Sequence, residues 1–130
     1  MTRSTRSAWR HAFLWIPPIV YAALILSLSS QSNPLPALTS LVWDKALHTA
    51  EYAGMAFLVC RALRGEGVRR WRSVALAILI ASAYAATDEW HQLFVAGRAA
   101  DVLDWTADTI GGAIGATTYT VVTGLIASVP

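Results

Sequence analysis

The chain has 130 residues, of which 55% are hydrophobic and 14% are charged, and its formal net charge is +2. Soluble domains contain about 25% charged residues, so this composition excludes an ordinary soluble domain, and the length leaves room for one compact unit. The single cysteine, Cys60, lies in an apolar run, which excludes a disulfide framework and a cysteine-based metal site. We therefore expect a membrane protein with a single domain over residues 1–130.

Long apolar segments follow one another along the chain, and a helix needs roughly 17 to 25 residues to cross a bilayer. We expect an all-α, polytopic protein with transmembrane helices at about 12–30, 44–63, 71–92 and 102–127. The first segment follows arginines, as a signal peptide would, but its length, its Pro17-Pro18 pair and the later segments favour a retained helix. The proline pair is placed near the inner end, where a first helical turn has no hydrogen bonds to lose.

The links between these segments differ in composition. The first link is rich in turn residues, with Asn33, Pro34 and Pro36 as helix breakers. In the last segment, Gly111 and Gly115 have the GxxxG spacing that is typical of close helix packing.

Lys and Arg are distributed unevenly between the links, and short cytoplasmic loops are enriched in these residues. Arginines gather before the first segment and between the second and third, whereas the other two links hold only Lys45 and Arg98. We therefore expect both termini in the cytoplasm and a multi-pass topology in the bacterial inner membrane. On that topology, eight arginines and Glu66 give the inner side +7, and two cations against seven acids give the outer side −5. Topology explains the basic residues, so no nucleic-acid partner is expected.

Polar residues at helical spacing occur at the outer ends of the last three segments. The stripes are Asp44, His48, Glu51 and Tyr52; Tyr84, Asp88, His91 and Gln92, with Glu89 just beside them; and Asp101, Asp104, Asp108 and Gly111. Residues at such spacings share one face of a helix. Because a charge at the bilayer centre costs roughly 2.5 to 3.5 kcal/mol, the stripes should face one another and a water-accessible cavity. Together they form a candidate functional site.

Structural roles are the alternative for these residues. Asp44, and Asp101 or Asp104, could cap the helices that follow them. A buried ion-pair network with Lys45 and Arg98 could instead hold His48, Glu51, Asp88 and Glu89. Two cations cannot neutralise seven acids. The surplus therefore requires protonated carboxylates, a metal ion or a cationic ligand.

Several blocks of these residues, in this order, resemble the VanZ-like family of small membrane proteins. The blocks are Ser29-Ser30-Gln31, Asp44-Lys45-x-x-His48-x-x-Glu51-Tyr52, Asp88-Glu89-x-His91-Gln92-x-Phe94-x-x-Gly97-Arg98 and Asp104-x-x-x-Asp108-x-x-Gly111. The chain departs from the family pattern at Ala96, where proline is frequent, and at Asp108, where asparagine is frequent. The family is named after a protein linked to low-level resistance to teicoplanin, a glycopeptide antibiotic. The resemblance therefore implies a cell-envelope role at the outer face.

The first expected function is an enzyme acting on a lipid-linked or cell-wall substrate. Its catalytic candidates are His48, Glu51, Asp88 and Glu89, and His48 or Glu51 would serve as the general base. Substrate contacts are expected from Lys45, Tyr52, Gln92, Arg98, Asp104 and Asp108. Asp44, His48, Asp88 and His91 could also hold a divalent ion such as Zn, Mn or Mg.

Two other functions remain open at this point. A non-catalytic protein could bind or modulate a glycopeptide, another amphiphilic antibiotic or an envelope lipid, because an acidic pocket attracts cationic groups. A small transporter subunit could use the carboxylates as a proton relay, although four helices would then require oligomerisation. The residues leave both the oligomeric state and the reaction open.

Overall fold

A computed structural model describes residues 3–32 and 43–128 of the chain, and this part is all-α, as predicted. Its helices are α1 (Arg3–Ser29), α3 (Asp44–Gly65), α4 (Arg70–Gln92) and α5 (Val102–Ala127). The last three begin and end within two residues of the expected bounds. The expected turn residues Asn33, Pro34 and Pro36 lie outside the described residues.

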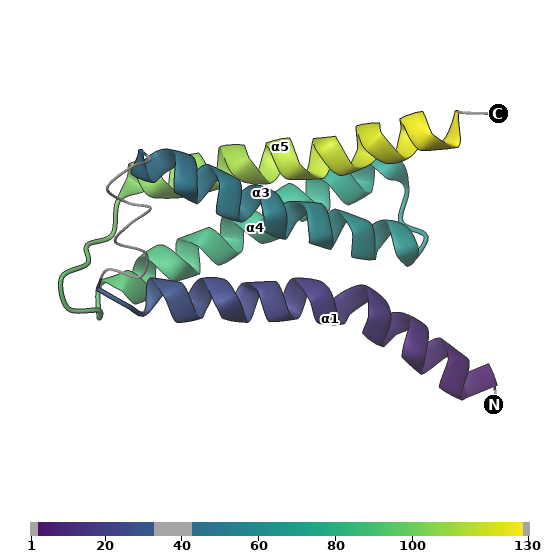
Figure 1. The fold of residues 1–130 in the computed structure, drawn as a ribbon, viewed down its shortest axis with the longest axis horizontal. Helices are drawn as coiled ribbons and strands as arrows, with labels where there is room; N and C mark the ends of the chain where they lie inside the picture. The colour runs from purple at the N-terminus through teal and green to yellow at the C-terminus, as the bar shows by residue number, and fades with distance from the viewer. Residues whose placement is uncertain (1–2, 33–42, 129–130) are drawn as a thin grey trace.

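Helix α1 is longer than expected, because it begins at Arg3 and not near residue 12. The residues before the apolar run include no glycine or proline, so nothing in them interrupts a helix. Pro17 and Pro18 therefore lie inside the helix, and their expected place in its first turn was wrong. An interior proline lacks an N–H group and its ring crowds the preceding turn, which bends a helix. Figure 1 shows the N-terminal part of α1 bending away from the other helices.

Helices α3 and α5 pack closely along each other, and α4 lies against both (Figure 1). A Cβ atom on Gly111 would contact the backbone carbonyl of Thr49, and one on Gly115 would contact that of Ala53. The backbones can approach this closely only because both residues are glycine, so the packing predicted from the GxxxG spacing is confirmed. Helix α1 is more peripheral and packs mainly against α3.

Two of the helices are long and apolar enough to cross a membrane: the segment Ser7–Ser29 of α1, and α5. Both carry large apolar side chains on their outer surfaces, including Ile19, Val20, Ile114 and Ile126. The chain therefore has an apolar outer surface of the kind that lipid covers.

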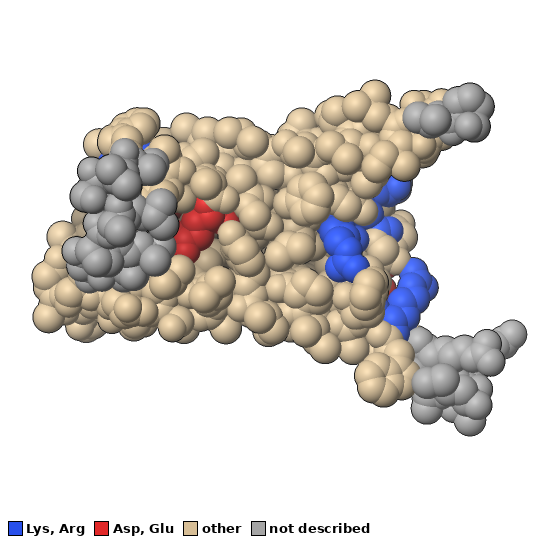
Figure 2. Space-filling model, viewed as in Figure 1, with Lys and Arg blue, Asp and Glu red and all other residues tan. Residues whose placement is uncertain are grey.

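The two ends of the bundle differ in charge. Both termini lie at one end (Figure 1), and Figure 2 shows Lys and Arg side chains towards that end. Acidic side chains are visible in the same view near the opposite end. The polar stripes predicted on α3, α4 and α5 occupy this acidic end.

Candidate functional site

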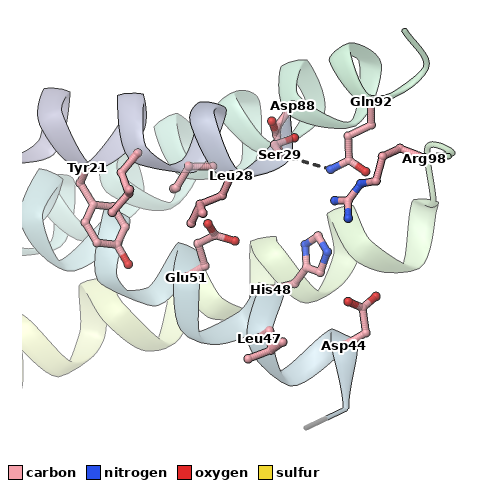
Figure 3. Close-up of a pocket in the computed structure, with 12 residues that line it drawn as sticks. Tyr21, Leu28, Ser29, Asp44, Leu47, His48, Glu51, Asp88, Gln92 and Arg98 are labelled. Carbon is pink, nitrogen blue, oxygen red and sulfur yellow. Dashed lines mark hydrogen bonds between the residues drawn. The ribbon is translucent and has the colours of Figure 1, made fainter. Parts of the chain in front are cut away.

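A cavity of about 260 Å³ opens at the acidic end, between α1, α3 and α4. One wall is apolar and comes mainly from α1, with Leu24, Ile25 and Leu28. The other wall is polar and comes from α3, α4 and the link before α5; its members are Asp44, His48, Glu51, Asp88, Gln92 and Arg98. Figure 3 shows the Arg98 guanidinium near Gln92 and His48, while Tyr21 lies at the far side of Glu51. The cavity thus joins an apolar surface to a charged one.

The α1 wall was not expected from the sequence. Its members Tyr21, Leu24, Ile25 and Leu28 have the i, i+3, i+4, i+7 spacing of one helical face. That spacing could have identified them, but the whole segment is apolar. Its periodicity therefore does not distinguish a face that lines a cavity from a face covered by lipid.

His48 lies at the centre of the acidic cluster and is buried. Its Nδ1 is 3.0 Å from Oδ1 of Asp108, and its Nε2 is 3.8 Å from Oδ1 of Asp104. Asp108 is only 1% exposed. The close approach of α5 to α3 therefore places a carboxylate directly against the imidazole.

Lys45 is engaged in ion pairs with Asp101 and Asp104, the two acids that the sequence suggests as caps of the last helix. Its Nζ donates hydrogen bonds to Oδ2 of Asp101, at 2.8 Å, and to Oδ1 of Asp104. Asp101 also caps α5, because its Oδ1 accepts the backbone N–H of Leu103 at 2.8 Å. The hydrogen bond from Lys45, together with that from Leu103, holds the pKa of the Asp101 carboxyl below its usual range. Asp44 does not cap α3, whose N-cap is Trp43 without a side-chain hydrogen bond.

At the end of α4, the residues that face the acidic cluster are not all the ones that the predicted stripe indicates. Glu89, expected just beside the stripe, is buried, and its Oε2 accepts the backbone N–H of Asp101 at 2.6 Å. Asp88 and Gln92 are buried together, with 3.4 Å between Oδ2 and Nε2. His91 instead lies beside α1, where its Nε2 is 3.0 Å from Oγ of Ser30. The expected set of metal ligands requires His91 to lie close to His48. The structure does not place it there.

Several buried polar atoms in this region have no hydrogen-bond partner among the described residues. They are Ser29 Oγ, Tyr52 OH, Asp88 Oδ1, Glu89 Oε1 and Asp108 Oδ2. Leaving such an atom unpaired costs about 1–3 kcal/mol, which is why buried polar groups are nearly always hydrogen-bonded. These atoms are therefore available to bind further groups.

A model of the VanZ/LLP1 family matches residues 2–123, nearly the whole chain. The chain belongs to the VanZ/LLP1 family. This confirms the resemblance carried by the blocks of polar residues and, together with the two apolar helices, identifies a VanZ-like membrane protein of the cell envelope. Searches of curated proteins and of solved structures found no match to the chain.

Among the described residues of this VanZ-like chain, two groups have the geometry to hold a metal ion. They are Asp44, His48 and Asp104, and His48, Glu89 and Asp108; within each group the ligand atoms lie within 4.8 Å of one another. Neither group includes Asp88 or His91. Arg98 completes the polar wall, and no carboxylate of residues 3–32 or 43–128 lies within ion-pair distance of it. The site thus offers carboxylates, an imidazole and a guanidinium to a bound molecule.

Proposed function

We propose that the chain crosses the bacterial inner membrane four times, with both termini in the cytoplasm and the cavity near the outer surface. Helices α3 and α4 have 22 and 23 residues. At 1.5 Å per residue they are about 33 Å and about 35 Å long, close to the roughly 30 Å hydrocarbon core. The arginines at the end that holds the termini support the same orientation, since cytoplasmic loops are enriched in Lys and Arg.

In this orientation the cavity binds an amphiphilic envelope molecule, such as a lipid-linked cell-wall precursor. The apolar wall of α1 would contact the lipid tail, and the polar wall would contact the head group. Arg98 is suited to an anionic group of that head, because guanidinium forms strong, directional hydrogen bonds with phosphate and carboxylate. The junction of these two walls in one cavity is the observation that carries the proposal.

The same cavity supports an enzymatic role, with His48 or Glu51 as the general base. Both line the polar wall. Asp108 orients the imidazole of His48, and an oriented base is the usual arrangement for proton transfer. When Nδ1 donates its proton to Asp108, Nε2 is available to accept a proton from substrate or water. The family resemblance extends this proposal to a contribution to teicoplanin resistance.

Mass spectrometry of lipids that co-purify with the full chain in detergent tests the binding step. An anionic, lipid-linked species should accompany the wild-type protein and be depleted in Arg98→Gln. Arg69→Gln is the matched control, because Arg69 lies on an exposed surface outside the cavity. Equal lipid content in Arg98→Gln and Arg69→Gln would contradict the proposed site.

A second candidate function, non-catalytic binding of an amphiphilic antibiotic or lipid, is favoured by the acidity of the cavity. Asp44, Glu51 and Asp88 line it against the single cation Arg98, so a cationic head group would be attracted. Glu51→Gln separates the two functions. A binder with this change retains its function with weakened affinity, whereas an enzyme that uses Glu51 as its base loses turnover while still binding.

A further inference from the structure

We propose that His48, Glu89 and Asp108 together bind one divalent metal ion where α3, α4 and α5 meet. This site goes beyond the proposed function, which concerns a lipid in the cavity, because the ion would bind whether or not a lipid is present. All three residues are buried, and each contributes one ligand atom within 4.8 Å of the other two. One imidazole nitrogen and two carboxylate oxygens, from three different helices, converge on this point.

The spacing of the closest two donors suits a shared ion. Nδ1 of His48 and Oδ1 of Asp108 are 3.0 Å apart. Two ligands that are each about 2.1 Å from a metal ion, and at a right angle to each other, are separated by about 3.0 Å. The pair can therefore ligate one ion with little movement of either side chain, and the ion would then replace the hydrogen bond between them.

The unpartnered oxygens are an independent indication of a ligand. Glu89 uses Oε2 to accept the N–H of Asp101, but its Oε1 is buried and has no hydrogen-bond partner within residues 3–32 and 43–128. Asp108 has a similar arrangement, because its Oδ1 contacts His48 while its Oδ2 is buried with no partner in the described part of the chain. Each carboxylate is more than nine-tenths buried. A cation bound by these oxygens would remove the cost of leaving them unpaired.

Charge balance favours the same conclusion. The nearby cation Lys45 is already hydrogen-bonded to Asp101 and Asp104. Glu89 and Asp108 therefore have no lysine or arginine partner in the described part of the chain, and His48 is the only basic group in contact with either. Burying both carboxylates in their ionised form requires a compensating positive charge, which a divalent ion supplies.

The other geometric group, Asp44, His48 and Asp104, is less suited to the ion. Asp104 Oδ1 already accepts a hydrogen bond from Lys45, whose positive charge would repel a metal ion. Asp44 is exposed. The buried group of His48, Glu89 and Asp108 should therefore attract a cation more strongly.

The donor set narrows the choice of metal, and the cavity offers a route to it. Imidazole suits Zn, whereas carboxylates suit Mn and Mg, so a mixed set of one nitrogen and two oxygens favours Zn²⁺ or Mn²⁺. His48 also lines the cavity, so an ion could enter there and would lie next to the polar wall.

The test uses the full chain in detergent, stripped with a chelator and then dialysed against Zn²⁺ or Mn²⁺ alone, with metal content measured by mass spectrometry. The wild-type protein should retain about one ion per chain. Glu89→Gln and Asp108→Asn should each weaken affinity roughly tenfold or more, since changes even to groups that only orient metal ligands cost 10–100-fold. Glu66→Gln is the matched control, because it removes a carboxylate at the opposite end.

Retention of the ion in both Glu89→Gln and Asp108→Asn would overturn the proposal, as would a wild-type chain that retains no ion. Loss of the ion in Asp44→Asn but not in Glu89→Gln would assign it to the other group and also overturn it. A rise in the melting temperature of the stripped wild-type protein on addition of metal gives a readout that depends on no variant. Because no lipid is present, failure here leaves the lipid-binding experiment unaffected.

Discussion

The imidazole of His48 on α3 faces the carboxylate of Asp108 on α5, with 3.0 Å between Nδ1 and Oδ1. This pairing depends on the close approach of the two helices, which Gly111 and Gly115 permit three and seven residues further along α5. The geometry of the polar site is therefore coupled to the packing of apolar helices.

Gly115→Ala should destabilise the fold and disturb the site. The new Cβ would collide with the backbone carbonyl of Ala53, which cannot move aside as a flexible side chain can. Overpacking of this kind costs about 1–3 kcal/mol. Thermal unfolding in detergent should show the loss. Gly124→Ala is the control on the same helix, because its Cβ would lie 3.6 Å from Arg70 Nη2, an ordinary contact. An equal loss in both variants would contradict the packing argument.

Asp88→Asn should stabilise the fold and lower function. Asp88 Oδ1 has no hydrogen-bond partner among the described residues, and the Asp88 side chain lines the cavity together with Glu51 and Asp44. Neutralising it removes repulsion among these acids, for a gain of about 1 kcal/mol, the trade-off typical of functional sites. The melting temperatures of the wild-type protein and Asp88→Asn show whether the substitution stabilises or destabilises the fold. A clear decrease in Asp88→Asn would favour the structural network instead.

The stability gap between the wild-type protein and Asp101→Asn should depend on pH. Two hydrogen bonds lower the pKa of Asp101 in the folded state: the larger effect comes from Lys45 and the smaller from the backbone N–H of Leu103. A lowered pKa stabilises the fold above the unfolded-state value, and the contribution is lost as pH falls through the folded-state value. The wild-type protein should therefore melt higher at neutral pH, and the gap should close below about pH 4. Melting curves between pH 3 and 7 measure it, and a constant gap would show that the Lys45 pair is unimportant.

The proposed topology predicts opposite labelling of two cysteines in a Cys60→Ala background. Ala99→Cys should react with a membrane-impermeant maleimide in intact cells, whereas Ser128→Cys should react only after permeabilisation. Both positions are exposed. They avoid Gly67 and Gly97, whose positive φ angles of 87° and 79° disfavour any side chain. The reverse labelling pattern would place the cavity on the cytoplasmic side.

The elements that could be predicted from the sequence are those with a local signal. Apolar runs located α3, α4 and α5 closely, but the start of α1 was missed because hydropathy marks the membrane segment and not the polar helical turns before it. The stripe on α3 placed His48 at the site. The pairing of Lys45 with Asp101 and Asp104, and the place of His91 beside Ser30, depend on how neighbouring helices are rotated. The rotation of one helix relative to its neighbours cannot be read from a single sequence.

The most direct test of the central claim is a comparison of envelope lipids and cell-wall precursors in a deletion strain complemented with three forms of the gene. The forms are wild type, Glu51→Gln and Glu66→Gln, matched for protein level in the membrane. The proposal predicts that one lipid-linked species accumulates in the deletion strain and in Glu51→Gln, and that wild type and Glu66→Gln restore its normal level. Restoration by Glu51→Gln as complete as by wild type would contradict a catalytic site in this cavity.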